Sequence, residues 1–163
     1  MTTVAPGAAG TRWLNDDEQR AWRAYLESTL LLFDALDRQM QQDSGMPHAY
    51  YEILVRLSET EGRNMRMSEL AVQTRSSRSR LSHAIDRLQE RGWVERNDCP
   101  TDRRGQLAQL TEKGFEVLAA AAPFHVAMVR QHVFDGLSPE QIAAMTAIGN
   151  SIITGLEPAA ASP

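Results

Sequence analysis

Apolar residues recur at every third or fourth position in the first third of the 163-residue chain, which is the spacing of one face of an α-helix. Asn15 and Glu18 match a reciprocal N-terminal cap and Ser44-Gly45 is a stop signal, so we predict one helix between them. About 29 residues at 1.5 Å each make a helix of roughly 43 Å, longer than a small domain is wide. Part of its apolar stripe is therefore expected to contact another chain, although an ordinary core helix would account for about half of the stripe. The stripe consists of Trp22, Tyr25, Leu26, Leu30, Phe33, Leu36 and Met40.

A second helix is predicted from Pro47, a favourable first residue, to a stop at Gly62. His48 falls in its first turn and is expected to be exposed to solvent. A ligand-binding role for His48 is the weaker alternative, because no second metal-type ligand is near it in sequence. The residues expected to face inward are Tyr50, Ile53, Leu54 and Leu57.

A short third helix is predicted at Glu69–Gln73, with Ser68 as its N-cap. Leu70 and Ala71 would form its buried side. A tight turn at residues 74–76 then leads directly into another helical pattern, which is the layout of a helix-turn-helix.

The fourth helix is expected to be capped by Ser76 or Ser77, to run to Arg91 and to end at Gly92. Its apolar positions share one face: Leu81, Ala84, Ile85 and Leu88. Helical geometry then places a polar set on the opposite face: Arg78, Ser79, Ser82, His83 and Asp86.

This polar face has the chemistry of a DNA-recognition helix. Arginine can donate two hydrogen bonds to guanine, and serine hydroxyls and an imidazole can bind base edges or phosphates. The N–H groups at the helix N-terminus point at phosphate. A merely solvated, charged face is the competing interpretation. The candidate DNA-binding residues on or beside this helix are Ser76, Ser77, Arg78, Ser79, Ser82, His83 and Arg87.

A β-hairpin is predicted next, with strands at residues 93–96 and 106–110 and a loop at 97–105 rich in turn-forming residues. Arg103 and Arg104 near its tip are candidate DNA contacts, able to reach along the backbone or into a minor groove. Phosphate would repel Asp102, so we expect it to pair with a nearby arginine and hold the shape of the tip. The predicted fold is mainly α with a small β-hairpin wing, a winged helix-turn-helix.

Charge is segregated along the chain. The net charge is −4, which alone argues against a nucleic-acid partner. Between Gly62 and Lys113, however, eleven basic and seven acidic residues give a local balance of +4, which leaves −8 for the remainder. Such asymmetry suits a protein that presents only one face to phosphates.

The C-terminal part is predicted to form two helices. Thr111 caps the first, which is kinked at Pro123 and ends at Gly136. Residues 138–141, Ser-Pro-Glu-Gln, are a strong start signal for the second. We interpret its apolar stripe as a dimer surface: Ile142, Met145, Ile148, Ile152 and Leu156.

Several classes of protein are disfavoured by composition. The chain shows no signal peptide and no apolar window long enough to span a membrane, so we expect a cytoplasmic protein with no membrane partner. Cys99 is the single cysteine, and no paired Cys/His spacing suggests a metal. The four histidines are scattered, without a nucleophile, base and orienter that converge, which argues against an enzyme. No cofactor is expected.

Two runs resemble the MarR family of bacterial transcriptional regulators: LSHAIDRLQERGWVER at residues 81–96 and DRRGQLAQLTEKG at residues 102–114. They contain the family's Asp-Arg-Leu, Gly-hydrophobic-Val-x-Arg, Asp-x-Arg and Leu-Thr-x-x-Gly patterns. The resemblance implies a homodimer in which the N- and C-terminal helices interlock. It also implies that two winged helices face successive major grooves of a pseudo-palindromic double-stranded DNA operator, as in a repressor released by a small molecule.

The resemblance also assigns individual positions. It places His83 at a base-reading position where relatives often carry arginine, which puts the base preference in doubt and leaves room for pH-sensitive binding. The family commonly binds small aromatic or lipophilic effectors, and aromatic residues of the first two helices could line such a pocket or simply pack in the core: Trp22, Tyr25, Tyr50 and Tyr51. Cys99 is a weak candidate for redox sensing, because peroxide sensors of the family generally place the cysteine in the first helix.

The interpretation divides the chain into a disordered tail at residues 1–12, an N-terminal dimerisation helix at 13–45, a winged helix-turn-helix at 46–114, C-terminal dimerisation helices at 115–158 and a disordered tail at 159–163. The main rival hypothesis is a winged helix that coats DNA nonspecifically or binds proteins.

Overall fold

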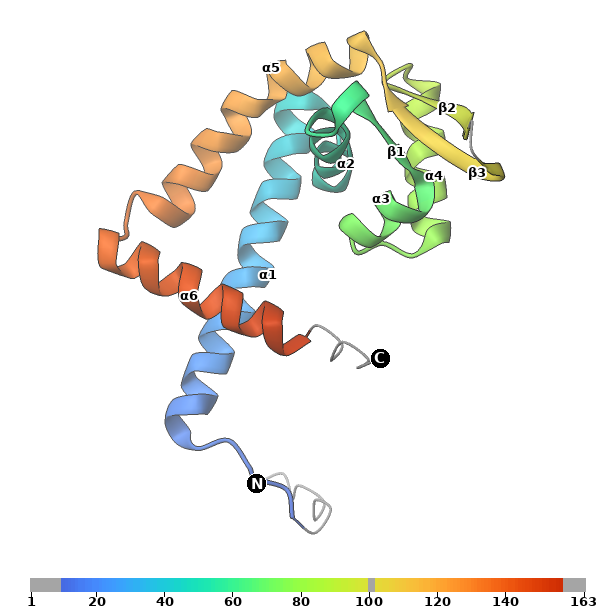
Figure 1. Cartoon of the computed structure of the whole chain (residues 1–163). Coiled ribbons are helices and arrows are strands. Elements are labelled where there is room, and N and C mark those ends of the chain that lie inside the picture. The colour runs from blue at the N-terminus through green and yellow to red at the C-terminus, as the bar shows by residue number, and fades with distance from the viewer. Residues whose placement is uncertain (1–9, 100–101, 157–163) are drawn as a thin grey trace. The chain divides into compact units, whose positions relative to one another are not determined.

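The computed structural model describes residues 10–99 and 102–156, with residues 102–104 described by their backbone alone (Figure 1). These residues are mainly helical with one small antiparallel sheet, which confirms the predicted fold class. The chain divides into two compact units, residues 1–35 and 36–163. The tails predicted at 1–12 and 159–163 lie outside the described residues, except for residues 10–12. Within the described ranges, none of the helices is both long and apolar enough to span a membrane.

Helix α1 (Asp16–Ser44) begins where its cap predicts. The Oδ1 of Asn15 accepts a hydrogen bond from the Glu18 N–H, and Glu18 Oε2 accepts one from the Asn15 N–H, each at 2.8 Å. Two of the four unpaired N–H groups of the first turn are therefore satisfied locally. Up to residue 35 its large apolar side chains are exposed except for the half-buried Leu32, whereas Leu36 and Met40 are buried in the second unit.

Helix α2 (His48–Ser58) is shorter than predicted at both ends. Pro47 precedes it in an extended conformation and is not its first residue. The helix ends at Ser58, well before Gly62, because the chain turns into the 3₁₀ segment η1 (Glu61–Arg63) with Gly62 at φ 69° and Arg63 at φ 54°. The inward face is confirmed for Ile53, Leu54 and Leu57, but Tyr51 is buried where Tyr50 was expected.

Helix α3 (Met67–Gln73) begins two residues earlier than predicted, so Ser68 lies inside the helix and is not its N-cap. Leu70 and Ala71 are buried, as expected. Helix α4 (Arg78–Glu90) follows, with Ser77 rather than Ser76 as its cap: the Ser77 Oγ accepts a hydrogen bond from the Arg80 N–H. Gly92 follows its C-terminus at φ 71°, the left-handed conformation that ends helices.

The three described strands are β1 (Asn64–Arg66), β2 (Val94–Cys99) and β3 (Asp102–Leu110), in the order β1-β3-β2. β1 was not predicted, because three mostly polar residues carry no strand pattern of their own. The hairpin strands extend through most of the predicted loop 97–105, since backbone pairs such as Asn97↔Leu107 and Asp98↔Gln106 form despite the low strand preference of Asn and Asp. The pairing register shifts between Asp98 and Cys99.

A single apolar core joins α2, α3, α4, the sheet and the first half of helix α5 (Glu112–Val129). Because its apolar side chains are fully buried and closely packed, a shift of α4 would open a cavity in the interior. This core therefore fixes α4 beside the hairpin. Its fully buried side chains include Leu54, Leu57, Leu70, Leu81, Ile85, Leu88 and Val94.

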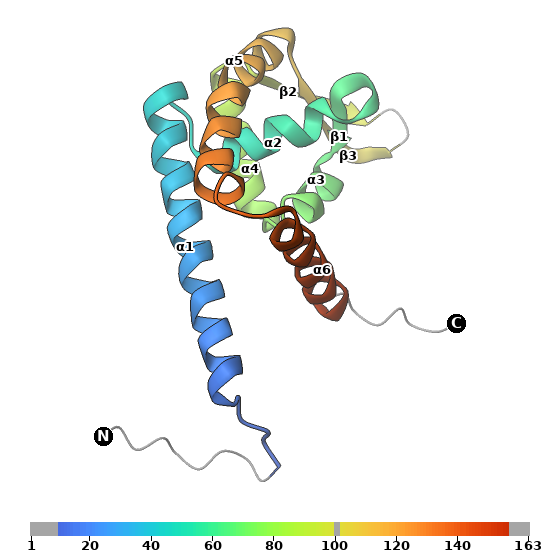
Figure 2. The same ribbon diagram turned by 90° about the vertical axis from the view of Figure 1, so that its left-hand side faces the viewer.

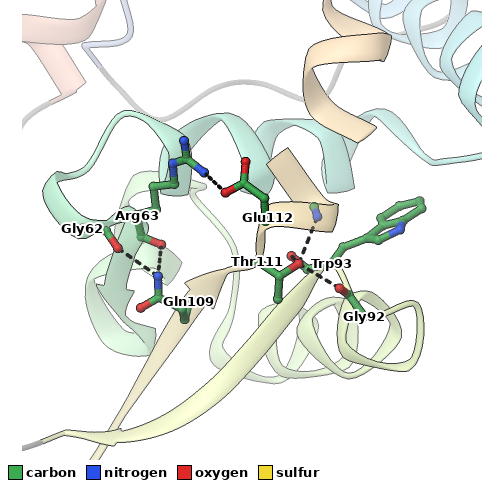
Figure 3. A network of polar contacts seen from close by, with 8 residues as sticks. Gly62, Arg63, Gly92, Trp93, Gln109, Thr111 and Glu112 are labelled. Carbon is green, nitrogen blue, oxygen red and sulfur yellow. Dashed lines mark hydrogen bonds and ion pairs between the residues drawn. The ribbon is translucent and has the colours of Figure 1, made fainter. Parts of the chain in front are cut away.

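The Leu-Thr-x-x-Gly segment forms the junction between hairpin and α5 (Figure 3). Thr111 Oγ1 accepts a hydrogen bond from the Gly114 N–H and donates toward the carbonyl oxygens of Gly92 and Trp93. Gly114 packs so closely that an added Cβ would lie 2.1 Å from the Trp93 carbonyl oxygen. Only glycine fits there without displacing backbone.

A second set of polar contacts ties η1 to the same junction (Figure 3). Gln109 Nε2 donates to the Gly62 carbonyl at 2.8 Å, and Arg63 pairs with Glu112 at 3.0 Å while lying over the Phe115 ring. The start of α5, β3 and the turn before β1 are thereby held together.

The C-terminal helices differ in part from prediction. α5 ends at Val129, and a π-helical segment, η2 (Arg130–Phe134), replaces the continuous helix expected up to Gly136. Helix α6 (Pro139–Leu156) starts as predicted, with reciprocal hydrogen bonds between Ser138 and Gln141. None of its residues is buried. Figure 2 shows the same helices from the side.

Candidate nucleic-acid interface

The turn between α3 and α4 positions the start of α4. Thr74 closes α3 through its Oγ1, which donates to the Leu70 carbonyl, and Arg75 then adopts φ 49°. This left-handed residue lets the Ser76 N–H donate back to the Ala71 carbonyl at 2.9 Å. The turn that leads into α4 is thus held by backbone hydrogen bonds.

The predicted outward face of α4 is largely confirmed as a surface. Arg78, Ser79 and His83 are exposed on its N-terminal half, opposite Leu81, Ile85 and Leu88. This set combines a guanidinium, a hydroxyl and an imidazole along two turns. Such groups can donate to guanine acceptors or to phosphate oxygens.

Ser82 and Asp86, from the same predicted face, are engaged within the chain. Arg96 on β2 donates from Nη2 to the Ser82 carbonyl at 2.9 Å and to its Oγ at 3.1 Å. The same nitrogen lies 2.8 Å from Asp86 Oδ1. The hairpin therefore contacts α4 through side chains that the sequence pattern had placed outside.

Arg87 lies further along α4 and is exposed. Its Nη1 pairs with Glu90 at 2.8 Å, and this hydrogen bond, together with the charge of Glu90, raises the pKa of the guanidinium. Arg91 lies over the Trp93 ring and donates to the Gly45 carbonyl at 3.0 Å, so it ties the end of α4 to the loop after α1.

The predicted wing residues Asp102, Arg103 and Arg104 are the first residues of β3. Their side chains lie outside the described part of the chain, so the predicted pairing of Asp102 stays a prediction. The described part of β3 next to them forms one wall of a cleft of about 360 Å³ beside the start of α4. Four further residues with polar side chains line the cleft: Arg66, Ser68, Arg78 and Ser82.

The expectation that His48 is solvent-exposed is wrong. His48 is only 8% exposed. Its ring stacks on His125 of α5, with centroids 5.3 Å apart, and Tyr51 lies 4.5 Å from His125. The reason is tertiary packing, because α5 covers the first turn of α2, which a local pattern cannot show.

Burial shifts the pKa values of His125 and Tyr51 in this cluster. Desolvation, aided by the neighbouring His48, lowers the pKa of His125 against an opposing effect of Glu52. The His125 Nδ1 atom is buried, with no hydrogen-bond partner among the described residues. Burial likewise raises the pKa of Tyr51.

The other residues considered for an effector or redox role are less informative. Trp22 and Tyr25 are exposed on α1 with ring centroids 6.3 Å apart, and Tyr50 is half-buried. Cys99 is buried at the end of β2, opposite Asp102 in the ladder. In the described residues, no group of three metal-type side chains is close enough to hold an ion.

Arg96 is the functional candidate that sequence reasoning missed. It was counted only as one of the basic residues of the region and as part of the Gly-hydrophobic-Val-x-Arg pattern. The available signal was strand alternation, which places Arg96 on the same face as the buried Val94 and opposite the exposed Glu95. An arginine half-buried on a strand needs a hydrogen-bonding partner.

Comparisons with known proteins agree with this geometry. The sequence model of the MarR family matches residues 44–105. Sco3205, a MarR family transcriptional regulator from Streptomyces coelicolor solved in complex with DNA, is 52% identical, with a TM-score of 0.89 over 93% of this chain and 95% of that chain. AbsC, a MarR family transcriptional regulator from the same organism, is 47% identical, with a TM-score of 0.85 over 90% of this chain and 98% of that chain.

A curated relative matches a shorter region. The transcriptional repressor MprA of Escherichia coli strain K12 is 35% identical over 85 residues, which are 52% of this chain and 48% of MprA. The match therefore spans about half the length of MprA, whereas the two Streptomyces structures match over nearly their whole length. The chain belongs to the MarR family of transcriptional regulators.

Proposed function

We propose that this protein is a sequence-specific regulator that binds double-stranded DNA through α4 and the wing. The observation that carries the proposal is the exposed set Arg78, Ser79 and His83 on the N-terminal half of α4, directly beside the hairpin that carries Arg103 and Arg104. The solved complex of the 52% identical Sco3205 with DNA supports it. The remaining proposed contacts are Ser76, Ser77 and Arg87, because Ser82 is already engaged by Arg96.

We propose further that the protein acts as a homodimer on a pseudo-palindromic operator. In the single chain, both α1 and α6 expose large apolar side chains, among them Trp22, Leu30 and Ile148. Exposed apolar surface of this extent marks an interaction site. A twofold dimer would present two α4 helices to half-sites about one helical turn of DNA apart.

We also propose that the protein represses transcription and that a small-molecule effector releases it from DNA. The relative MprA is named as a transcriptional repressor, which supports repression here. A small aromatic or lipophilic effector would release the DNA, with its contact residues left unassigned. A mobility-shift assay with added aromatic acids and lipophilic phenols tests the release. The protein would act in the cytoplasm, where the chromosome lies, without a cofactor.

Genome-wide footprinting with purified protein tests the DNA-binding proposal. We expect a small set of protected sites that share an inverted repeat and survive competition by bulk DNA as salt is raised. Protection without sequence preference would mean nonspecific coating, and no protection at any salt would favour a winged helix that binds proteins. Either outcome contradicts the proposed function.

His83→Ala tests base reading at α4. We expect the preference for the operator over single-base variants to fall by about tenfold at the base pair that His83 faces. His132→Ala, which changes an exposed histidine outside α4, is the matched control. Unchanged affinity ratios across the operator variants would exclude His83 as a base reader.

The double variant Arg103→Ala with Arg104→Ala tests the wing. Losing two phosphate contacts should weaken binding and reduce the slope of log affinity against log salt by about 2. Arg56→Ala with Arg130→Ala removes the same charge from exposed positions outside α4 and the hairpin. An unaltered slope in the wing variant would show that the wing does not contact DNA.

A further inference from the structure

We infer that Arg96 is a positioning residue that locks the wing strand β2 to the DNA-facing side of α4 and thereby sets the operator selectivity of the protein. The inference rests on the proposed function, because it assigns a role within the same interface. It also reassigns Ser82 and Asp86, which serve as the docking points of the hairpin on the helix.

The contact geometry is the first observation. One nitrogen, Arg96 Nη2, lies 2.9 Å from the Ser82 carbonyl oxygen, 3.1 Å from Ser82 Oγ and 2.8 Å from Asp86 Oδ1. Ser82 and Asp86 are four residues apart and therefore adjacent on one helix face. A donor that bridges two successive turns opposes rotation of α4 about its axis relative to β2.

Burial is the second observation. The Arg96 side chain is only 22% exposed, and its Nε atom is buried with no hydrogen-bond partner among the described residues. A guanidinium stays charged at any ordinary pH and is costly to bury unless it is paired. Since Nε lacks such a partner, the three contacts of Nη2 supply pairing that keeps the side chain in place. Loss of those contacts would leave a nearly buried charge uncompensated.

The position of the clamp on α4 connects it to recognition. His83 follows Ser82 directly, and Ser79 lies one turn before it. Hydrogen bonds to base edges need donor–acceptor distances of about 2.7–3.2 Å. A small rotation of α4 relative to the wing would therefore break the DNA contacts of one of these two elements while the other stays bound. The wing and α4 can contact the same DNA site only if their relative orientation is fixed.

The clamp also offsets an unfavourable charge. Asp86 is 49% exposed on the face of α4 that would approach phosphates. Arg96 neutralises that carboxylate from the side of the hairpin. Removal of Arg96 would therefore have two effects, a loosened hairpin and an unmasked acid, and a second substitution at Asp86 separates them.

The experiment compares full-length variants on two duplexes: the strongest site recovered by footprinting and a shuffled duplex of the same composition. The variants are Arg96→Met, Arg96→Lys, Asp86→Asn and the double variant R96M/D86N. Arg56→Met is the matched control, because it removes one arginine and one ion pair, with Glu59, on the surface of α2. Dissociation constants are measured over a salt series, and folding is checked by circular dichroism.

We expect Arg96→Met to lower the ratio of shuffled to operator dissociation constants by about tenfold, with the salt slope of operator binding unchanged. The double variant should bind both duplexes more tightly than Arg96→Met but keep the low ratio, because the charge is balanced while the clamp is absent. Arg96→Lys keeps the charge without the fork of donors, so its ratio should lie between those of the wild type and Arg96→Met. If Arg96→Met does not fold, the ratio measured for Arg96→Lys tests the inference instead.

Four outcomes would overturn the inference. A salt slope reduced by about 1 would make Arg96 a phosphate contact. A ratio restored in R96M/D86N would make Arg96 a counter-charge and nothing more. Wild-type ratios in both Arg96 variants would leave the clamp without a role in selectivity, and an equal fall in Arg56→Met would make the effect one of general charge. If the wild-type protein itself shows no preference between the duplexes, the proposed function fails first, and this result is recognisable before any variant is made.

Discussion

Helices α4 and α6 share the same apolar periodicity but bury it to opposite extents. In α4 the side chains of Leu81, Ile85 and Leu88 are at most 1% exposed. In α6 Ile148 is 58% and Leu156 73% exposed, and no residue of the helix is buried. Since most helical stability in proteins comes from packing of the apolar face, α6 needs a surface that the described residues of one chain do not supply.

The difference shows what an apolar stripe can and cannot predict. The spacing identifies an amphipathic helix and its inner face, in α4 as in α6. It does not say whether the covering surface comes from the same chain. In α4 the cover is α2, α3 and the sheet, joined in one core, so the orientation of α4 is fixed within each chain.

The largest expected effect comes from a comparison of two glycines, Gly114 in the packed junction of the hairpin with α5 and Gly149 on the uncovered helix α6. At Gly114 an added Cβ would lie 2.1 Å from the Trp93 carbonyl oxygen and 2.8 Å from Leu110 Cδ1. We expect Gly114→Ala to lower the free energy of unfolding by about 3 kcal/mol or more, because backbone must move to relieve the overlap. Urea unfolding followed by circular dichroism measures it.

Gly149→Ala is the matched control, on α6. An added Cβ there meets nothing within 4 Å in the single chain, so better helix propensity should stabilise the helix by about 1 kcal/mol or less. A Gly114→Ala protein as stable as the wild type would contradict the close approach at the hairpin junction. A loss of dimer in Gly149→Ala would place that glycine where two chains pack closely.

The second prediction compares one isoleucine from each helix. Ile85 is fully buried, and Ile85→Ala should cost about 2–5 kcal/mol of unfolding free energy at every protein concentration. Ile148→Ala should act through the proposed dimer, so its cost should appear as a lower mass in light scattering at low concentration and as a concentration-dependent melting temperature. A cost for Ile148→Ala that is independent of concentration, in a protein that stays monomeric throughout, would mean that α6 packs within its own chain.

Local signals account for the parts of the fold that were predicted. The caps at Asn15, Ser77, Thr111 and Ser138 depend on side chains within three residues of the N–H groups that they bind, so the sequence pattern is sufficient to find them. The buried face of α4 follows from its own spacing. These elements are defined by neighbours along the chain.

The parts that could not be predicted depend on contacts between distant residues. β1 is a strand because Asn64, Met65 and Arg66 pair with β3, and the buried His48 stacks on His125 of α5, which lies far from it in sequence. Ser82 showed the outward position of a DNA contact, yet the Arg96 side chain from the hairpin occupies it. For the interface, the exposed face of α4 was therefore predictable, while the side chains that hold it in place were not.

The smallest expected effect contrasts two histidines near the end of α5. Burial and the neighbouring His48 lower the pKa of His125 below its usual value of about 6.5, so the unfolded chain takes up this proton at a higher pH than the folded one. The stability from a neutral His125 is present above about pH 6.5 and is lost as the pH falls toward the lower pKa of the folded state.

We therefore expect the wild-type melting temperature to fall between pH 7 and pH 5, and His125→Gln, which cannot titrate, to show a shallower fall. The change should be smaller than either of the preceding effects, because His125 keeps partial access to solvent and Glu52 opposes the shift. His132→Gln is the control, since this histidine is exposed and its loss should leave the pH dependence as in the wild type. If His132→Gln flattens the curve as much as His125→Gln does, His125 is not the source of the acid sensitivity, and the contrast between covered and uncovered side chains does not extend to protonation.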